Sequence, residues 1–227
     1  MKIIKPSYEI LAPPGMDEFP SGTEILEFIE RAGRTCYKSE DRITPGSAEK
    51  FARMLVHERK HHSVIEHVSM SVRFVIDRGV SHELVRHRLC AFSQESTRYC
   101  NYAKDKFGEE ITVIEPCFWG GVENSSRRRT WRDACQAAED AYFWQLNSGA
   151  TSQEARSVLP NSLKTEIVVT ANLREWRHIL TLRAGKAAHP QMREVMVPLL
   201  ADLKTRIPVV FDNILEGLEK GSKDAKR

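Results

Sequence analysis

A strict alternation of apolar residues with mostly polar neighbours runs from Val68 to Ile76. A period of two is typical of a β-strand with one buried face, so this segment predicts a half-buried strand. A helix from His82 to about Arg88 is expected to follow at once, with Ser81 as its N-cap. A strand that passes directly into a helix favours a mixed fold, and it places Arg86 and Arg88 near the end of that helix.

The remaining elements follow from apolar periodicity and capping signals. A second strand is expected from Thr165 to Ala171, where β-branched residues dominate. Helices are predicted at residues 23–32, 47–60 with Ser47 as N-cap, 126–147, a short segment opened by the capping box of Thr151 and Glu154, 173–183 behind the cap Asn172, 191–204 and 209–218. These elements predict an α+β fold with a central, mostly antiparallel sheet flanked by helices.

Length and composition limit the class of protein. The 227 residues contain no repeat or Gly/Ser-rich linker, so we expect one domain over residues 1–220 and a disordered tail at 221–227. Five cysteines without a CxxC pair argue against a disulfide framework and favour a reducing cytoplasm. We expect neither export nor a membrane span, and a net charge of +3 is too small to indicate general nucleic-acid binding.

The segment RHRLCAFSQESTR, residues 86–98, concentrates cations and polar groups. Residues two apart on a helix diverge by about 200°, so Arg86 and Arg88 cannot grip one small group unless the helix ends there, which implies two ligands or one long ligand. If residues 92–98 are extended, Gln94, Ser96 and Arg98 share one face and suit a nucleotide phosphate. A solvated helix end and an exposed polar edge strand are the structural alternatives.

Two further arginines stand out. Arg183 continues the apolar stripe of Trp176, Ile179 and Leu180, where a cation is costly without an anionic partner. Arg156 lies in the short helix before Pro160. For both, an internal salt bridge and a ligand contact remain open.

Histidines cluster in HHSVIEH, residues 61–67, which suggests a metal site at first sight. The spacing is not HExxH, and a turn leading into the strand at Val68 is the favoured interpretation. No metal is therefore predicted.

Several of these segments, in this order, resemble the flavin-dependent thymidylate synthases. The residues 61–67, with the pattern H-x-S-x-x-E-H, resemble that family's turn before its long strand, and RHRLCAFSQESTRY resembles its signature with the same spacing. EARSVLP around Arg156, the Asn172-Leu173-Arg174 helix start and LTLR at Arg183 are similar to later family blocks.

The resemblance implies an enzyme that methylates dUMP to dTMP, with methylenetetrahydrofolate as carbon donor and FAD, reduced by NADPH, as hydride donor. It implies a homotetramer with the flavin between subunits, and no Rossmann pocket, because no GxGxxG follows a predicted strand. Arg183 is the implied catalytic residue, contacting the uracil. The implied dUMP contacts are Glu83, Leu84, Val85, Arg86, Gln94, Glu95, Ser96, Thr97, Arg98, Arg156 and Arg183. The implied FAD contacts are Ser63, Arg86, His87, Arg88, Gln94, Asn172, Arg174 and His178.

Some positions depart from the family pattern. Cys36 stands where the family often has serine, and residues 184–188 lengthen the run between Arg183 and His189, which the resemblance implies as a flavin neighbour. Cys90 and Cys100 are interpreted as packing residues, and Ser96 as a positioning group rather than a nucleophile.

Two other classes of protein would use other parts of the sequence. A nucleic-acid-binding module would use Arg127, Arg128 and Arg129 with Trp131, although a solvated helix face is the simpler interpretation of that triplet. A metal-dependent hydrolase would need the cluster at residues 61–67 to hold an ion.

Overall fold

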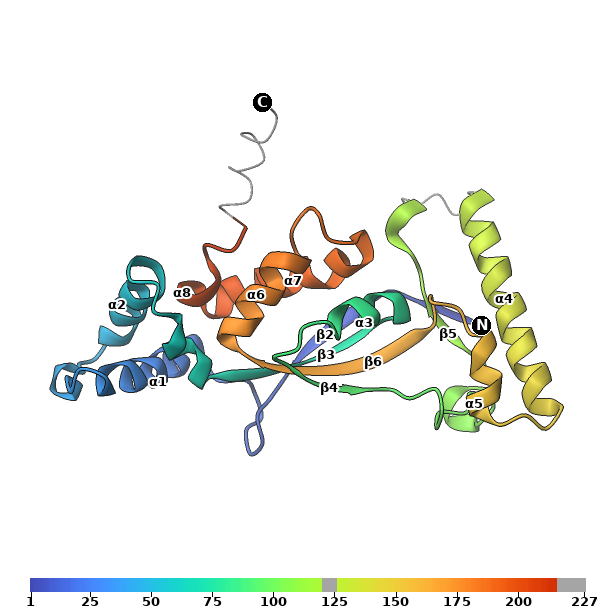
Figure 1. Ribbon diagram of the computed structural model, residues 1–227, viewed down its shortest axis with the longest axis horizontal. Coiled ribbons are helices and arrows are strands. Elements are labelled where there is room, and N and C mark those ends of the chain that lie inside the picture. Colours follow the sequence, from blue (N-terminus) through green and yellow to red (C-terminus); the bar gives the residue numbers. More distant parts are fainter. Residues whose placement is uncertain (120–125, 216–227) are drawn as a thin grey trace, which may run out of the picture. The chain divides into compact units, whose positions relative to one another are not determined.

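The computed structural model describes residues 1–119 and 126–215 (Figure 1). The chain divides into two compact units. The first unit comprises Met1–Tyr8, Arg73–Arg86 and Phe92–Val168, and the second comprises Glu9–Val72, His87–Ala91 and Val169–Arg227. The single domain expected over residues 1–220 stays a prediction, and the expected tail at 221–227 lies outside the described residues.

Four strands form an antiparallel sheet in the order β2-β3-β6-β4. Their bounds are β2 Ser7–Leu11, β3 Ser69–Asp77, β6 Lys164–Asn172 and β4 Ala91–Gln94. Burial alternates along β3 and β6, because every second side chain points to the apolar face. The two predicted strands and the mixed helix-and-sheet fold are confirmed.

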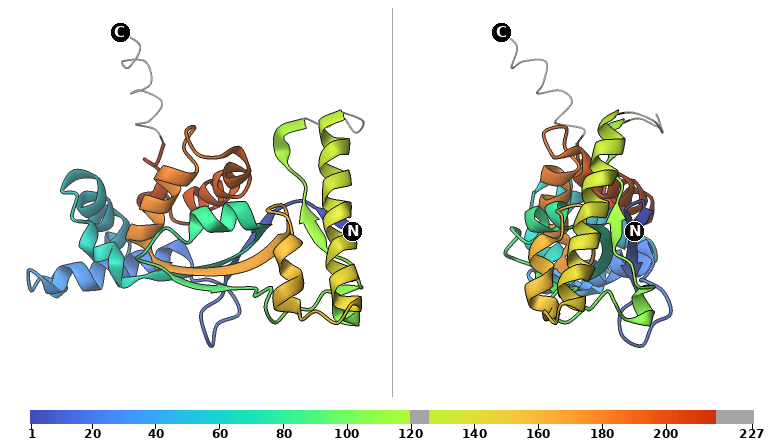
Figure 2. Two further views of the ribbon diagram at one scale, coloured as in Figure 1. Left: turned by 45° about the vertical axis from the view of Figure 1, so that its right-hand side comes forward. Right: turned by 90° about the vertical axis from the view of Figure 1, so that its right-hand side faces the viewer.

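The first unit also contains a small parallel sheet that the sequence did not suggest. In it β1 (Lys2–Ile4) pairs with β5 (Thr112–Ile114), with Lys2 opposite Thr112. The helix α4 (Ser126–Asn147) confirms the predicted bounds and packs on α5 (Ser152–Ala155), as Figure 2 shows. Short 3-10 turns lie at Asp105–Phe107, Cys117–Trp119 and Arg156–Val158. Tyr102, Tyr142, Ile111 and Leu163 are buried together in this unit's apolar core.

The helix after β3 begins earlier than predicted. It is α3, Arg78–Leu84, and its N-cap is Asp77, whose carboxylate accepts from the Val80 N–H at 2.8 Å. The predicted N-cap Ser81 lies inside the helix instead, and its hydroxyl donates to the Arg78 carbonyl. Aspartate is as good an N-cap residue as serine, so the cap falls one turn earlier at Asp77. Consequently Arg86 and Arg88 both lie beyond the helix end.

The strand predicted over residues 92–98 is also shorter than expected. β4 ends at Gln94, and the chain turns at Ser96, whose carbonyl accepts from the backbone N–H groups of Tyr99 and Cys100. The alternation of Gln94, Ser96 and Arg98 on one strand face is therefore wrong. Serine and threonine favour such turns, because their hydroxyls bond to nearby backbone groups.

The second unit is helical outside the shared strands. Its helices are α1 (Gly22–Thr35), α2 (Ser47–Arg53), α6 (Leu173–Arg183), α7 (Pro190–Arg206) and α8 (Pro208–Phe211), with a π-helical turn at Met54–Glu58 and 3-10 turns at Glu40–Arg42 and His62–His67. α1 packs on α2, and α6 packs on α7. A Cβ at Gly33 would lie 2.7 Å from the Phe51 ring, so only glycine permits this approach of α1 to α2.

Two predicted boundaries in the second unit are wrong. Gly46, not Ser47, is the N-cap of α2, and the Ser47 hydroxyl instead donates to the buried Glu30 carboxylate at 2.7 Å. Within the described residues, the helix predicted over 209–218 is only α8, because Pro208 starts a new turn and the chain leaves the helix after Phe211, while 216–218 lie outside the described residues. No helix in the described part of the chain is long and apolar enough to cross a membrane.

Candidate active site

The helix α6 carries the first group of functional candidates. Its predicted cap is confirmed, because Asn172 Oδ1 accepts from the Glu175 N–H at 2.9 Å. Trp176, Ile179 and Leu180 are fully buried, and the Trp176 indole donates to the Met70 carbonyl. Arg183 lies at the end of this helix and is partly buried, as its place on the apolar stripe indicated.

Arg183 makes a hydrogen bond to a buried histidine. Arg183 Nε donates to His87 Nε2 at 3.0 Å, and the His87 side chain is only 6% exposed. Burial, together with the positive charge of Arg183 and the neighbouring His178, lowers the pKa of His87 to about 4. The ring is therefore neutral near pH 7, which lets it accept a hydrogen bond from a guanidinium.

Two side chains of α6 complete this cluster. A carboxylate oxygen of Glu175, 8% exposed, lies 3.7 Å from His87 Nδ1. The exposed His178 ring stands edge-on to His87, with 5.7 Å between the ring centroids. The structure thus brings the predicted residues His87, His178 and Arg183 together. Nothing in the sequence singles out Glu175, because an acid in a helix's first turn is ordinarily explained by the helix dipole.

The cluster of His87, Glu175 and His178 has side chains that can bind a metal, but a positive charge lies beside it. Among the described residues, His87, Glu175 and His178 form the one group whose ligand atoms lie close enough for an ion. However, a guanidinium N–H already occupies His87 Nε2. A permanent cation at that distance disfavours a second cation, so the arrangement suits an anionic ligand.

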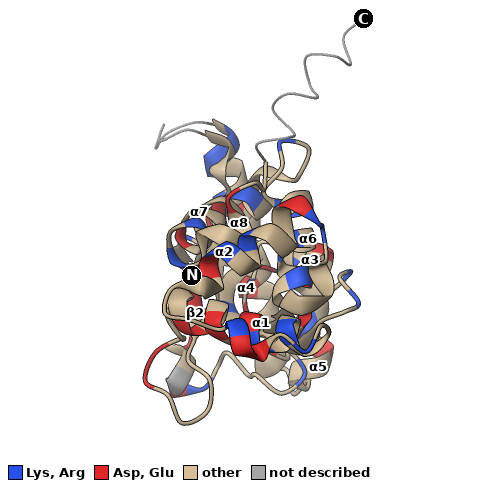
Figure 3. Ribbon diagram, turned by 90° about the vertical axis from the view of Figure 1, so that its left-hand side faces the viewer, with Lys and Arg blue, Asp and Glu red and all other residues tan. Residues whose placement is uncertain are grey.

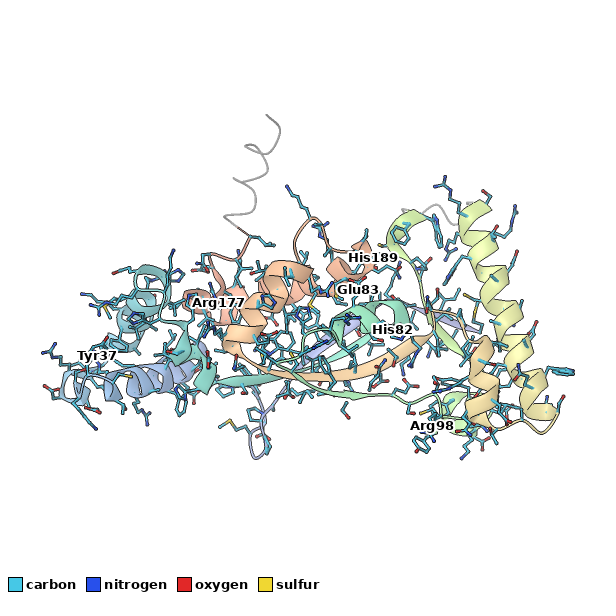
Figure 4. All side chains as sticks on the ribbon, viewed as in Figure 1. Tyr37, His82, Glu83, Arg98, Arg177 and His189 are labelled. Atoms are coloured by element: carbon cyan, nitrogen blue, oxygen red, sulfur yellow. The ribbon has the colours of Figure 1, made fainter. Side chains whose placement is uncertain are left out.

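The pKa of His87 predicts how stability depends on pH. Since the folded ring has a pKa of about 4 and the free ring one of 6.5, the unfolded chain binds more protons between these values. The free energy of unfolding should therefore be retained above pH 6.5 and decrease as the pH falls towards 4. Urea titrations at pH 7.5 and 5 should show a smaller decrease for His87→Gln than for wild type. His82 is exposed and labelled in Figure 4, and His82→Gln is the matched control. Equal decreases in the free energy of unfolding of all three proteins would contradict the account.

Two other predicted flavin residues of the second unit, Ser63 and Arg174, lie at the 3-10 turn His62–His67. Arg174, on α6, forms an ion pair with Glu66 of this turn, and Ser63 is exposed on it. His62 Nε2 bonds to the Val56 carbonyl instead of facing the other histidines. These contacts agree with a structural turn before β3 rather than a metal site.

The first unit holds the second group of candidates, around β4 and the turn after it. The Gln94 amide nitrogen donates to the hydroxyls of Ser81 and Thr165 at 2.9 and 3.2 Å. The Ser96 hydroxyl accepts from the Arg98 N–H at 3.3 Å, and the exposed Arg98 side chain leaves this turn, as Figure 4 shows. Because both bonds of Gln94 use its nitrogen, its carbonyl oxygen is the group that can face a ligand.

Arg156 belongs to the same group. Its Nη1 donates to the Thr97 hydroxyl at 3.4 Å, which links the 3-10 turn after α5 to the turn after β4. Of the α3 residues, Leu84 is buried and Glu83 is half-buried, whereas Val85 and Arg86 follow the helix and are exposed. The structure therefore gathers Thr97, Arg98 and Arg156 within one small part of this unit.

Glu95 differs from its neighbours in the signature. Its carboxylate accepts from the Tyr102 hydroxyl at 3.1 Å and from Lys164 Nζ at 3.0 Å. These groups line a hollow of about 410 Å³ in the first unit, with Lys2 and Glu110 on its wall. The side chain is thus held by its own unit, and the expected dUMP contact of Glu95 stays a prediction.

The positions that depart from the family pattern lie at element ends. Cys36 is the exposed C-cap of α1, and His189 is the exposed N-cap of α7. Burial, and secondarily the Glu175 carboxylate, raises the pKa of the Cys90 thiol to about 11. A thiol that resists ionisation is a poor nucleophile, in agreement with a packing role for Cys90.

The structure argues against a nucleic-acid-binding module that uses the Trp131 ring. Trp131 is half-buried and donates to the Ser162 hydroxyl at 2.9 Å, while Arg128 pairs with Glu115 at 2.6 Å. Figure 3 shows acidic and basic residues mixed along α1 rather than a continuous basic strip on it. These contacts favour the interpretation of the arginine triplet as a solvated helix face.

Comparison with known proteins decides between the classes. The family model of the thymidylate synthase complementing protein matches residues 22–209. A flavin-dependent thymidylate synthase of Corynebacterium aurimucosum is 34% identical over 224 residues, which cover 89% of this chain and 86% of the relative. The chain belongs to the flavin-dependent thymidylate synthase family. The resemblance of residues 61–67 and 86–99 to this family is thereby confirmed.

Other flavin-dependent thymidylate synthases match over similar lengths. The protein of Corynebacterium glutamicum is 32% identical, over 98% of this chain and 95% of its own. The protein of Geobacter sulfurreducens is 33% identical, over 81% and 79%. A crystal structure of the UMP/dUMP methylase PolB from Streptomyces cacaoi, bound with 5-Br dUMP, shows the same fold, with a TM-score of 0.71. It is 24% identical in sequence, and the match covers 93% of this chain and 96% of that chain.

Proposed function

We propose that this flavin-dependent thymidylate synthase family member methylates dUMP to dTMP, taking the methylene group from methylenetetrahydrofolate and the hydride from FAD reduced by NADPH. Family membership over most of the chain supports this reaction. The structural observation that carries it is the Arg183–His87 hydrogen bond, which holds a partly buried guanidinium beside a neutral ring. Such a group is suited to an anion or to negative charge that develops during a reaction.

The cations after α3 fit a flavin dinucleotide. Arg86 and Arg88 are exposed, and neither has a carboxylate partner among the described residues. Guanidinium groups of this kind suit the pyrophosphate of FAD, which without a Rossmann loop must meet side-chain cations. Once bound and reduced by NADPH, FAD supplies the hydride. The proposed contacts are Ser63, Arg86, His87, Arg88, Gln94, Asn172, Arg174 and His178.

For dUMP, we assign the phosphate to the turn after β4. The Ser96 hydroxyl, the exposed Arg98 and the Arg156 guanidinium supply donors from adjacent segments of the first unit. The carbonyl oxygen of Gln94, whose amide nitrogen is already engaged, is suited to accept from an N–H group of the base or the flavin. The remaining proposed contacts are Glu83, Leu84, Val85, Arg86, Glu95, Thr97 and Arg183.

Arg183 is the proposed catalytic residue. Its guanidinium is assigned to the uracil ring, where it would stabilise negative charge on the pyrimidine as the new bond forms. Because His87 contributes no charge of its own near pH 7, the positive charge of Arg183 is not offset by a salt bridge to that ring.

A cytoplasmic homotetramer with FAD at subunit interfaces completes the proposal. Leu89 and Tyr99, within the signature, are 78% and 76% exposed in the single chain. Large apolar side chains at a ligand site are suited to being covered by another subunit. The five free cysteines agree with a reducing compartment.

The reaction is tested by tritium release from 5-tritiated dUMP, since the hydrogen on C5 must leave when a methyl group replaces it. We expect release that requires methylenetetrahydrofolate, and dTMP formation that requires FAD and NADPH as well. UMP serves as the matched substrate control for the role of the sugar. Absence of release with all components present would contradict the proposed function.

A further inference from the structure

We propose that Glu175 and His87 are positioning residues, which together fix the orientation of the Arg183 guanidinium. The inference rests on the proposed function for its catalytic meaning, because Arg183 is assigned there to the uracil. Its geometry stands on the contacts of the second unit alone. In this proposal neither residue contacts the uracil.

The first step concerns the proton on His87. An arginine Nε carries one hydrogen and can only donate, so the 3.0 Å bond from Arg183 requires a lone pair on His87 Nε2. A neutral imidazole has one proton, which must then reside on Nδ1. The geometry therefore selects one of the two neutral tautomers.

The second step concerns the carboxylate that faces Nδ1. Glu175 Oε1 lies 3.7 Å from this nitrogen, longer than a hydrogen bond but close enough to favour a proton on that side of the ring. The Glu175 carboxylate is buried, and its backbone is fixed at the start of α6 by the Asn172 cap. The backbone of this acid is thus fixed independently of the histidine.

The third step concerns what the chain of contacts does to Arg183. With Nε bound to a buried ring, the position and the plane of the guanidinium are restrained. Fixing a flexible side chain before the substrate arrives lowers the entropic cost of placing its charge during the reaction. Glu175 and Arg183 lie at opposite ends of α6, so His87 joins the two ends of one rigid helix.

This arrangement also gives a reason for a histidine between Arg86 and Arg88. Its neighbours are exposed, whereas His87 is buried with both ring nitrogens directed at α6. A flavin contact by His87 would then use its backbone or ring face. The Arg-His-Arg motif would then have two roles. Arg86 and Arg88 would bind ligands, and the buried His87 ring would position the catalytic Arg183.

The tautomer is tested directly by nitrogen NMR of the full-length protein carrying ¹⁵N-labelled histidine. We expect His87 to be neutral with its proton on Nδ1 at pH 7, and Glu175→Gln to increase the population with the proton on Nε2. Glu27→Gln, an exposed change on α1, is the matched control and should leave the His87 signals unchanged. A proton on Nε2 in the wild type, or a charged ring, would overturn the inference whether or not the enzyme makes dTMP.

The positioning role is tested by the rate of dTMP formation. His87→Leu removes the acceptor and should lower kcat about tenfold, the effect of one hydrogen bond to a charged group, with KM for dUMP changed less than threefold. His87→Gln offers an amide oxygen at a similar position and should recover most of the loss. In an Arg183→Lys background, which lacks the Nε–H, His87→Leu should have less than a twofold further effect.

The outcomes separate the two proposals. If wild type makes no dTMP, the proposed function fails, while the NMR result still decides the geometry. If wild type makes dTMP and His87→Leu does so equally well, the positioning role is overturned. Equal losses for His87→Leu in the wild-type and Arg183→Lys backgrounds would also overturn it, because they would reflect a structural effect that does not pass through Arg183.

Discussion

Replacing Arg183 with alanine should lower the rate of dTMP formation by about 100- to 1,000-fold, the usual effect of removing one preorganised donor from a developing anion. The fold should survive, because Arg183 lies at the last turn of α6 and is only partly buried. Loss of the guanidinium also leaves the His87 ring without its donor, a small cost in stability. Single-turnover assays with bound FAD already reduced would separate this effect from that of flavin reduction.

Lys186→Ala is the matched control for this variant. It removes an exposed cation just beyond α6 and should leave the rate within twofold of wild type. Comparable far-UV circular dichroism and unfolding midpoints for both variants would exclude loss of fold as the cause. A rate for Arg183→Ala within tenfold of wild type would remove Arg183 from the catalytic role.

Arg98→Ala should raise the dissociation constant for dUMP by about 10- to 100-fold, as expected for a lost charge-assisted contact of about 1.5–3 kcal/mol. Its guanidinium is exposed and stands over the Tyr99 ring at 5.3 Å, so its removal should not disturb the core. The binding defect should shrink when deoxyuridine, which has no phosphate, replaces dUMP. Isothermal titration calorimetry with the two ligands measures the difference.

Arg129→Ala is the control for Arg98→Ala. This exposed arginine of α4 lies in the same unit and belongs to the triplet considered for nucleic acid. It should leave dUMP affinity unchanged. If the two variants weaken binding equally, the effect reflects general electrostatics, and the assignment of the phosphate to the turn after β4 fails.

The regular elements were the most predictable part of the fold. The alternation along β3 and β6, the span of α4 and the Asn172 cap all follow from local patterns, and the structure confirms them. Boundaries failed where two residues competed for one role, as Asp77 and Ser81 did for the cap of α3. The pairing of β1 with β5 joins segments over one hundred positions apart, and strands of three residues have too short a pattern to reveal it.

For the site, the sequence indicated which residues are functional candidates, but it did not indicate which groups they contact. Arg183 was conspicuous because it interrupts an apolar stripe, but the stripe does not show what the guanidinium contacts. The structure shows a hydrogen bond to His87, whose place between two arginines suggested an outward ligand contact instead. Nothing in the sequence indicated a role for Glu175, because that role depends on contact with a residue 88 positions away along the sequence.

The account depends most on arginines from separate segments meeting at one nucleotide. A crystal structure of the full-length protein with FAD and dUMP tests this directly. We expect the phosphate within hydrogen-bonding distance of Ser96, Arg98 and Arg156, and the Arg183 Nη groups at the uracil ring, each supplied by one subunit or another. A nucleotide bound away from these groups, or Arg183 directed into solvent with no ligand beside it, would contradict the account.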